Sequence, residues 1–168
     1  MLTGKKGIIF GVANQHSLAW KIAQRCAAHG AQLAIAYQND RFEEKVNALA
    51  RELPDAFTLQ CDLNNDAEIQ QVASTLRERW GQVDFMAHCV AYALREELMG
   101  RYLDTSREGF KIALETSVYT FVAATRHLEP ILRDGASILT LTYLGSERVV
   151  PGYNVTVSYT HLRAHETP

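Results

Sequence analysis

The sequence predicts an α/β fold built on a doubly wound parallel sheet. Two observations predict it. Short apolar runs alternate along the chain with longer stretches in which apolar residues recur at helical spacing. The short runs are continuously apolar, which is typical of strands covered on both faces, and the stretches between them are long enough for parallel crossovers. The pattern therefore indicates a Rossmann-like sheet, truncated after about five strands.

Each expected element is bounded by a glycine, a proline or a polar residue. Strands are expected at 7–12, 31–37, 57–61, 83–89 and 137–142. Helices are expected at 17–29, 42–53, 65–80 and 105–130, with a looser charged segment before the last of them. Gly30 and Pro54 follow the first two helices as stop signals. Asn65 with Glu68, and Thr105 with Glu108, have the spacing of a helix cap and its return partner.

Composition narrows the classes of protein. The chain has 168 residues, 47% of them hydrophobic and 21% charged, which suits one globular domain with a real core. The formal net charge of −2 gives no indication of nucleic acid or of an anionic membrane as a partner. No apolar run is long enough to span a bilayer, and no signal peptide precedes the first strand.

The cysteines fit the same picture. Cys26, Cys61 and Cys89 are scattered, without disulfide or metal-ligand spacing, so we expect buried side chains and no metal site. Unpaired cysteines indicate a reducing cytoplasm.

The stretch 8–20 carries the strongest functional signal, because it is a strand, a turn and a helix start in direct succession. Gly11 would let the backbone turn tightly and approach a pyrophosphate. Ser17 can cap the helix, whose free N–H groups and positive dipole end would then face the phosphates, with Leu18 beside them. The general dinucleotide fingerprint has three glycines, and only Gly11 is present here.

Polar and small residues follow the other predicted strands, where ligands bind in such sheets. Gln38 can hydrogen-bond a ribose hydroxyl but offers no charge for a 2′-phosphate, which favours NADH over NADPH; an ordinary polar turn would look the same. Asp62 could accept from an adenine amino group while Leu63 packs on the ring, or it could be a turn residue. Small neighbours of Val90 would let a nicotinamide ribose lie against the backbone.

Several segments together resemble the bacterial enoyl-acyl-carrier-protein reductases, a branch of the short-chain dehydrogenase/reductase superfamily. The resemblance covers residues 1–155 and is carried by Gly-Val-Ala-Asn-x-x-Ser-Leu-Ala at 11–19 and by the segments 104–108, 117–119 and 139–155. It implies reduction of trans-2-enoyl chains on acyl carrier protein by NADH, the last step of each cycle of bacterial fatty-acid elongation. It also implies a homotetramer for members of full length.

Tyr143 and Tyr153 are the candidate catalytic residues. Reducing a double bond conjugated to a thioester needs a donor to the enolate oxygen as charge develops there, and a phenol hydroxyl can supply it. We assign that donor to Tyr153 and place Tyr143 in the pocket wall; in the family the two tyrosines at this spacing face the enoyl thioester. Two tyrosines that merely pack their rings would give the same sequence pattern.

The resemblance ends near residue 155. The family has a lysine seven residues after the second tyrosine, and Thr160 stands there. We therefore divide the chain into an incomplete reductase domain at 1–155 and a non-family tail at 156–168, which from about residue 157 resembles translated sequencing-adapter read-through. Threonine has neither the reach nor the charge of lysine. We expect weak NADH binding, little or no catalysis, and a weakened basis for the tetramer.

Two other functions fit parts of the sequence. Ser146, Tyr159 and Arg163 have the spacing of the serine, tyrosine and lysine of a carbonyl-reducing short-chain dehydrogenase, with arginine in place of lysine. A non-catalytic nucleotide-binding fragment is the second alternative. Replacing Tyr159 or Tyr153 by phenylalanine would separate the two reductases, while NADH binding without turnover would favour the fragment.

Overall fold

The computed structural model describes residues 2–148 and 150–164, with side chains up to residue 160. These residues fall into two compact units. The first runs to Cys89 and includes Ala123–Leu139; the second comprises Val90–Val122 and the residues from Thr140 onward. The expected boundary near residue 155 stays a prediction. No helix in the described part of the chain has the length and hydropathy needed to cross a membrane.

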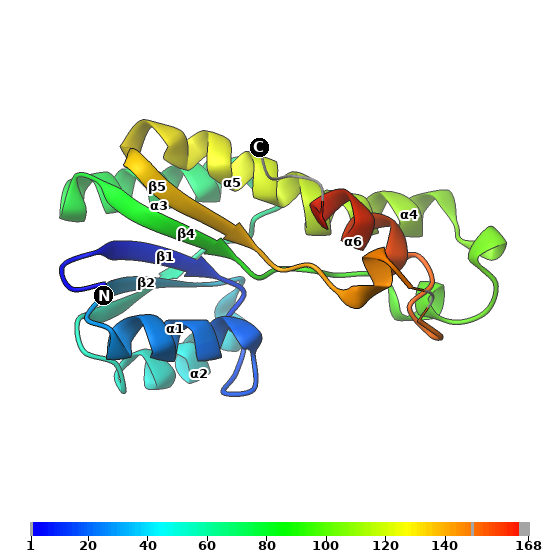
Figure 1. The fold of residues 1–168 in the computed structure, drawn as a ribbon, viewed down its shortest axis with the longest axis horizontal. Coiled ribbons are helices and arrows are strands. Elements are labelled where there is room, and N and C mark those ends of the chain that lie inside the picture. Colours follow the sequence, from blue (N-terminus) through cyan, green and yellow to red (C-terminus); the bar gives the residue numbers. More distant parts are fainter. Residues whose placement is uncertain (1, 149, 165–168) are drawn as a thin grey trace. The chain divides into compact units, whose positions relative to one another are not determined.

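The first unit is built on a five-stranded sheet with strand order β3-β2-β1-β4-β5 (Figure 1). The strands are β1 (Lys6–Phe10), β2 (Gln32–Tyr37), β3 (Ala56–Gln60), β4 (Val83–His88) and β5 (Leu132–Thr140). The β1–β2, β1–β4 and β2–β3 pairs are parallel. The structure thus confirms the predicted fold class, and the strand order reverses between β1 and β4, where such sheets bind ligands.

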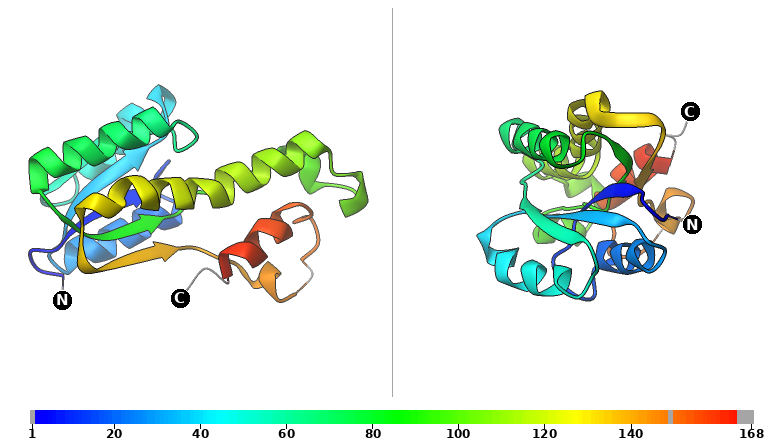
Figure 2. Two further views of the ribbon diagram at one scale, coloured as in Figure 1. Left: turned by 90° about the horizontal axis from the view of Figure 1, so that it is seen from above. Right: turned by 90° about the vertical axis from the view of Figure 1, so that its left-hand side faces the viewer.

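Helices cover both faces of this sheet (Figure 2). They are α1 (Leu18–Ala28), α2 (Asp40–Ala50), α3 (Asp66–Trp80) and α5 (Thr120–Leu128). Ile9, Leu33 and Ile35 pack with Trp20 of α1 and Val46 of α2 in one buried cluster. Because side chains alternate along a strand, Ile8 and Ala34, which are also fully buried, face the opposite side.

The edge strand β5 differs from the expectation. It begins at Leu132, five residues before the predicted start at 137, and it includes Asp134-Gly135, a dipeptide that is typical of turns. A buried carboxylate holds this half in the sheet: Asp84 Oδ1 lies 3.2 Å from Arg133 Nε and 2.9 Å from Lys5 Nζ. Asp84 Oδ2 also accepts from the Lys6 N–H at 2.9 Å. Charge pairing between distant segments therefore helps to hold the first half of β5 in the sheet.

Asp84→Asn should destabilise the first unit in a pH-dependent way. Burial alone would raise the pKa of Asp84, but the hydrogen bonds from Lys6 and Lys5 and the charges of Lys5 and Arg133 outweigh it, so the pKa lies below its ordinary value. A lowered pKa in the folded state stabilises the fold above the unfolded pKa, and this stabilisation is lost as the pH falls through the folded one. We expect a loss of about 1–3 kcal/mol in the free energy of unfolding at pH 7, shrinking below about pH 4.

Urea unfolding from pH 7 to pH 3 measures this effect. Asp134→Asn is the matched control, because Asp134 is exposed on β5, next to Arg133, which pairs with Asp84. We expect it to change the free energy of unfolding by less than about 0.5 kcal/mol at any pH. Equal losses for both variants would show that the Asp84 cluster does not stabilise the fold.

The second unit contains shorter elements. Its helices are the 3₁₀ turns Arg95–Leu98, Tyr102–Asp104 and Leu144–Ser146, α4 (Arg107–Leu114), the π turn Glu115–Tyr119 and α6 (Thr156–Ala164). The prediction that Thr105 caps α4 was wrong by one residue. Ser106 is the N-cap and accepts from Gly109 N at 2.9 Å, while Thr105 donates to Tyr102 O. Glu97, from outside the helix, accepts from the N–H of Ser106 at 3.1 Å.

Candidate nucleotide site and candidate active site

The first unit places its candidate nucleotide residues along one edge of the sheet. The carboxyl ends of the strands are in register, since Phe10 pairs with Ala36 and with His88, and Tyr37 pairs with Gln60. The chain leaves this edge through Gly11 after β1, Gln38 after β2 and Asp62 after β3. Sequence reasoning had placed these residues at strand ends, and the strand register brings those ends to one edge.

The loop between β1 and α1 is shaped by a serine in an unexpected role. Ser17 is the N-cap residue of α1, but its side chain does not cap the helix. Its Oγ accepts instead from the backbone N–H groups of Ala13 and Asn14, each at 3.1 Å. The expected capping role of Ser17 was therefore wrong, because its hydroxyl turns back onto the loop. The N–H groups of the first turn of α1 remain available to an anion.

Gly11 has a backbone conformation that only glycine adopts readily, with φ of 98°. This positive φ turns the chain out of β1 into the loop. Leu18, the first residue of α1, is 68% exposed beside the loop. A turn, a folded-back loop and an uncapped helix start can hold the pyrophosphate of a dinucleotide, so the residues present fit such a group.

Gln38 and Asp62, expected separately, are in contact. Gln38 Nε2 lies 3.3 Å from Asp62 Oδ2, and Asp62 Oδ1 accepts from the side-chain amide of Asn64 at 2.9 Å. Asp62 Oδ1 also accepts from Asn64 N at 3.0 Å, as in the turn that was the alternative interpretation. An amide and a carboxylate side by side can bind ribose and adenine groups but repel a 2′-phosphate.

The two remaining nucleotide candidates, Leu63 and Val90, are less exposed than Gln38. Leu63 is buried, with 5% of its surface exposed, and Val90, at the start of the second unit, is half-buried. Cys61 is buried, and burial together with the charges of Glu68 and Asp62 raises its pKa to about 12. This thiol is therefore not a nucleophile near neutral pH. Cys26 and Cys89 are only half-buried, so the expectation of burial holds for Cys61 alone.

In the second unit the two candidate catalytic tyrosines lie together. The rings of Tyr143 and Tyr153 are stacked, with centroids 4.7 Å apart and planes inclined by 20°. Tyr143 precedes a 3₁₀ turn in which Ser146 Oγ donates to Tyr143 O at 3.0 Å. Tyr153 precedes α6, and its carbonyl accepts from Thr156 N at 2.9 Å. Both phenols are therefore carried on residues whose backbones are fixed by adjoining turns.

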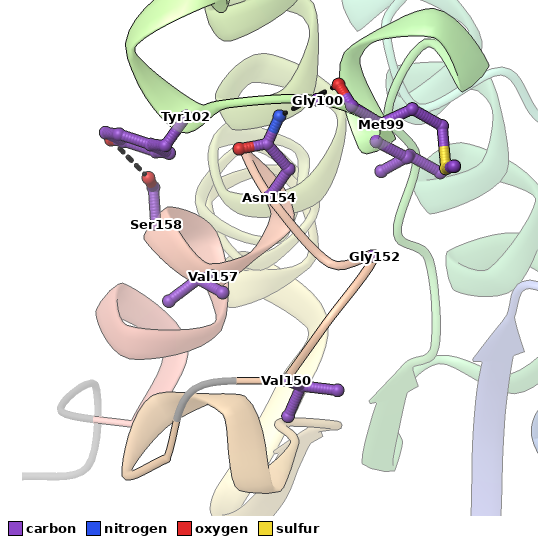
Figure 3. Close-up of a pocket in the computed structure, with 9 residues that line it drawn as sticks. Met99, Gly100, Tyr102, Val150, Gly152, Asn154, Val157 and Ser158 are labelled. Carbon is purple, nitrogen blue, oxygen red and sulfur yellow. Dashed lines mark hydrogen bonds between the residues drawn. The ribbon is translucent and has the colours of Figure 1, made fainter.

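The second unit has a hollow of about 520 Å³, and its lining includes Gly152 and Asn154, the sequence neighbours of Tyr153 (Figure 3). Two segments line it: Leu98, Met99, Gly100 and Tyr102 from one, and Val150, Gly152, Asn154, Val157 and Ser158 from the other. Tyr102 and Ser158 are joined by their hydroxyls at 3.0 Å, and the remaining lining side chains are mostly apolar.

A buried serine, Ser117, holds the segment after β4. It lies in the segment 117–119 that carries part of the resemblance, but the sequence alone assigned it no role of its own. Ser117 Oγ accepts from Tyr92 N at 3.0 Å and donates to Tyr92 O at 3.1 Å. Ser117 lies in the π turn, where Thr120 N bonds to Glu115 O, five residues earlier. π turns are frequent at functional sites. The sequence carries no signal for this turn, because the extra residue changes neither composition nor periodicity.

Thr160 is buried on α6, with 2% of its surface exposed. Its hydroxyl donates to Thr156 O at 2.8 Å, and its carbonyl accepts from the Thr142 hydroxyl at 2.9 Å. The residue that stands where the family has a lysine is thus short and uncharged, and its hydroxyl is bonded within its own helix.

Comparison with known proteins decides the family. The profile of the family described as Enoyl-(Acyl carrier protein) reductase matches residues 11–164. The chain belongs to this family. It is 45% identical over 155 residues to the Enoyl-[acyl-carrier-protein] reductase [NADH] 1 of Rhizobium meliloti, a match that covers 92% of this chain and 57% of that protein. The chain thus spans less than two thirds of the length of this relative.

Solved structures of the family agree with the fold. The Enoyl-[acyl-carrier-protein] reductase (NADH) of Aquifex aeolicus has a TM-score of 0.92 and 41% identity, over 96% of this chain and 70% of that one. The reductase of Anaplasma phagocytophilum, solved in complex with NAD, has the same TM-score and identity over 95% of this chain and 61% of that one. The Bacillus cereus reductase, solved with NADP⁺ and an indole naphthyridinone, has a TM-score of 0.92 and 40% identity, over 95% of this chain and 63% of that one.

Proposed function

We propose that this chain binds NADH through its first unit and carries, in its second unit, the tyrosines that act on a trans-2-enoyl thioester of acyl carrier protein. We propose further that Thr160 leaves it with little or no turnover. The observation that carries the nucleotide proposal is the loop after β1, where Ser17 binds Ala13 N and Asn14 N and leaves the start of α1 uncapped.

The contact between Gln38 and Asp62 supports NADH over NADPH. A 2′-phosphate beside Gln38 would lie near the carboxylate of Asp62, 3.3 Å from the Gln38 amide, and would be repelled by it. The nearest cation in sequence, Arg41, lies with its guanidinium 5.9 Å from the Phe42 ring centroid. The Anaplasma relative was solved with NAD and the Bacillus cereus relative with NADP⁺.

The tyrosine pair supports a role in stabilising negative charge. Bound NADH would supply a hydride to the β-carbon of the enoyl thioester. The Tyr153 hydroxyl donates a hydrogen bond to the thioester oxygen as that oxygen becomes an enolate, and the stacked ring of Tyr143 fixes the Tyr153 ring. The apolar side chains of the adjoining hollow suit the acyl chain.

The positions of Ser146 and Tyr159 give less support to a carbonyl-reducing dehydrogenase. Tyr159 is only 8% exposed and packs in a cluster with Ala113 and Val155, so its phenol is held inside the second unit. Ser146 is engaged with the carbonyl of Tyr143. Tyr153 is half-buried, and its sequence neighbours Gly152 and Asn154 line the hollow, so it is better placed than Tyr159 to meet a substrate.

Titration of the chain with NADH and NADPH by isothermal calorimetry tests the nucleotide proposal. We expect NADH to bind more tightly than NADPH, and Asp62→Asn to reduce that preference. A parallel assay with an enoyl thioester should show little oxidation of NADH. Rapid turnover would contradict the role given to Thr160, and failure to bind either nucleotide would contradict the site.

A further inference from the structure

The geometry of the second unit points to Asn154 as a positioning residue for Tyr153, acting through a side-chain amide clamp on the turn Arg95–Leu98. This inference rests on the proposed function, because it matters for catalysis only if Tyr153 meets the substrate. The ring position of Tyr153 is nevertheless measurable without turnover.

Asn154 follows Tyr153 directly and has an unusual backbone. Its φ is +33°, in a region that non-glycine residues rarely adopt and that asparagine tolerates better than most. Such a conformation persists only when the surroundings hold it. Asn154 has such contacts, because its Nδ2 donates to Glu97 O at 2.8 Å. The same Nδ2 lies 3.5 Å from Met99 O (Figure 3). The amide thus joins residues 57 positions apart in the chain.

The turn that receives this amide is itself fixed to α4. The Glu97 carboxylate accepts from Ser106 N at 3.1 Å and from Ser106 Oγ at 2.5 Å, at the N-cap of α4. Gly109 makes room for it, since a Cβ there would lie 2.5 Å from the Glu97 carboxyl group. Asn154 is therefore tied, through Glu97, to the first turn of a regular helix.

The residues on either side of Asn154 have fixed positions of their own. Val155 is completely buried and packs with Ala113 of α4. Tyr153 N lies 3.3 Å from Val150 O, and the Tyr153 carbonyl accepts from Thr156 N at 2.9 Å. The left-handed turn at Asn154 sets the direction in which the chain leaves Tyr153 for Val155, and with it the direction of the Tyr153 ring. Without the amide, the strain at residue 154 has no compensating contact.

Proton NMR of the tyrosine rings tests the clamp, because two rings stacked at 4.7 Å shift each other's ring protons upfield. Tyr143→Phe and Tyr153→Phe assign the signals. In Asn154→Asp, whose side chain keeps its shape but cannot donate, we expect the upfield displacement to be lost. Asn154→Gly relieves the backbone strain but also removes the amide, so a folded protein with the same loss is expected.

Asn47→Asp is the matched control for the added charge, because the Asn47 side chain accepts from Thr58 through its oxygen and needs no amide donor. It should leave the ring signals unchanged. Unchanged ring signals in both Asn154 variants would overturn the inference, as would equal changes in Asn47→Asp. If the chain fails to bind NADH, or Thr160→Lys fails to reduce an enoyl thioester, the proposed function fails while this result stands. Where the Thr160→Lys variant turns over, Asn154→Asp should lower its kcat by about tenfold or more.

Discussion

Thr160→Lys should raise NADH-dependent reduction of an enoyl thioester by about a hundredfold over the chain with threonine. The Thr160 hydroxyl donates to Thr156 O within the same helix, so this side chain offers a ligand neither a free hydrogen-bond donor nor a charge. A lysine at this buried position can run its methylene stem past the helix surface and place its ammonium group beyond it. There the cation would favour negative charge on the thioester oxygen.

Two further variants separate charge from bulk. Thr160→Met has a side chain of similar length without charge, and it should give no gain. Tyr153→Phe, added to Thr160→Lys, should remove most of the gain, because the enolate oxygen then lacks its phenol donor. Steady-state rates of NADH oxidation, with circular dichroism as a check on folding, measure both. Equal rates for the lysine and methionine variants would show that the missing charge does not limit turnover.

The regular elements could be predicted from the sequence, because their periodicity is set by burial. Continuous apolar runs predicted β1 to β4 and the second half of β5. Ile69 and Leu76, spaced for one helix face, are indeed buried. The expected edge of the sheet and the residues that leave it, among them Gly11 and Asp62, followed from the same pattern. Local periodicity is strong evidence where a segment has one buried face.

The sequence-based predictions were wrong where side-chain contacts that periodicity does not reveal accompany the end of an element. Thr105 had the cap spacing, but Glu97 reaches Ser106 from another segment and moves the helix start by one residue. Ser17 was expected to cap α1 and instead binds the loop before it. The first half of β5, where no strand was expected, carries the pairing of Arg133 with Asp84. A single sequence shows which side chains can bond, but it does not show which partner the tertiary fold brings to them.

Gly11→Val should weaken NADH binding by about tenfold or more. With φ of 98°, residue 11 holds a conformation that is strained for a side chain branched at Cβ. The chain can relieve the strain only by rotating the loop, which moves Ala13 N and Asn14 N away from Ser17 Oγ. The backbone N–H groups at the start of α1 then no longer lie opposite a fixed turn, so they no longer bind the pyrophosphate together. Calorimetric titration with NADH measures the loss.

Strain alone would lower stability without affecting the ligand, and Gly81→Val isolates that effect. Gly81 has φ of 76° at the end of α3, and a Cβ there would meet nothing within 4 Å. The free energy of unfolding should therefore fall by a similar amount in the two valine variants, about 1–3 kcal/mol each. Only Gly11→Val should also lose affinity for NADH. If both variants bind NADH as the unchanged chain does, the nucleotide is held somewhere other than the loop after β1.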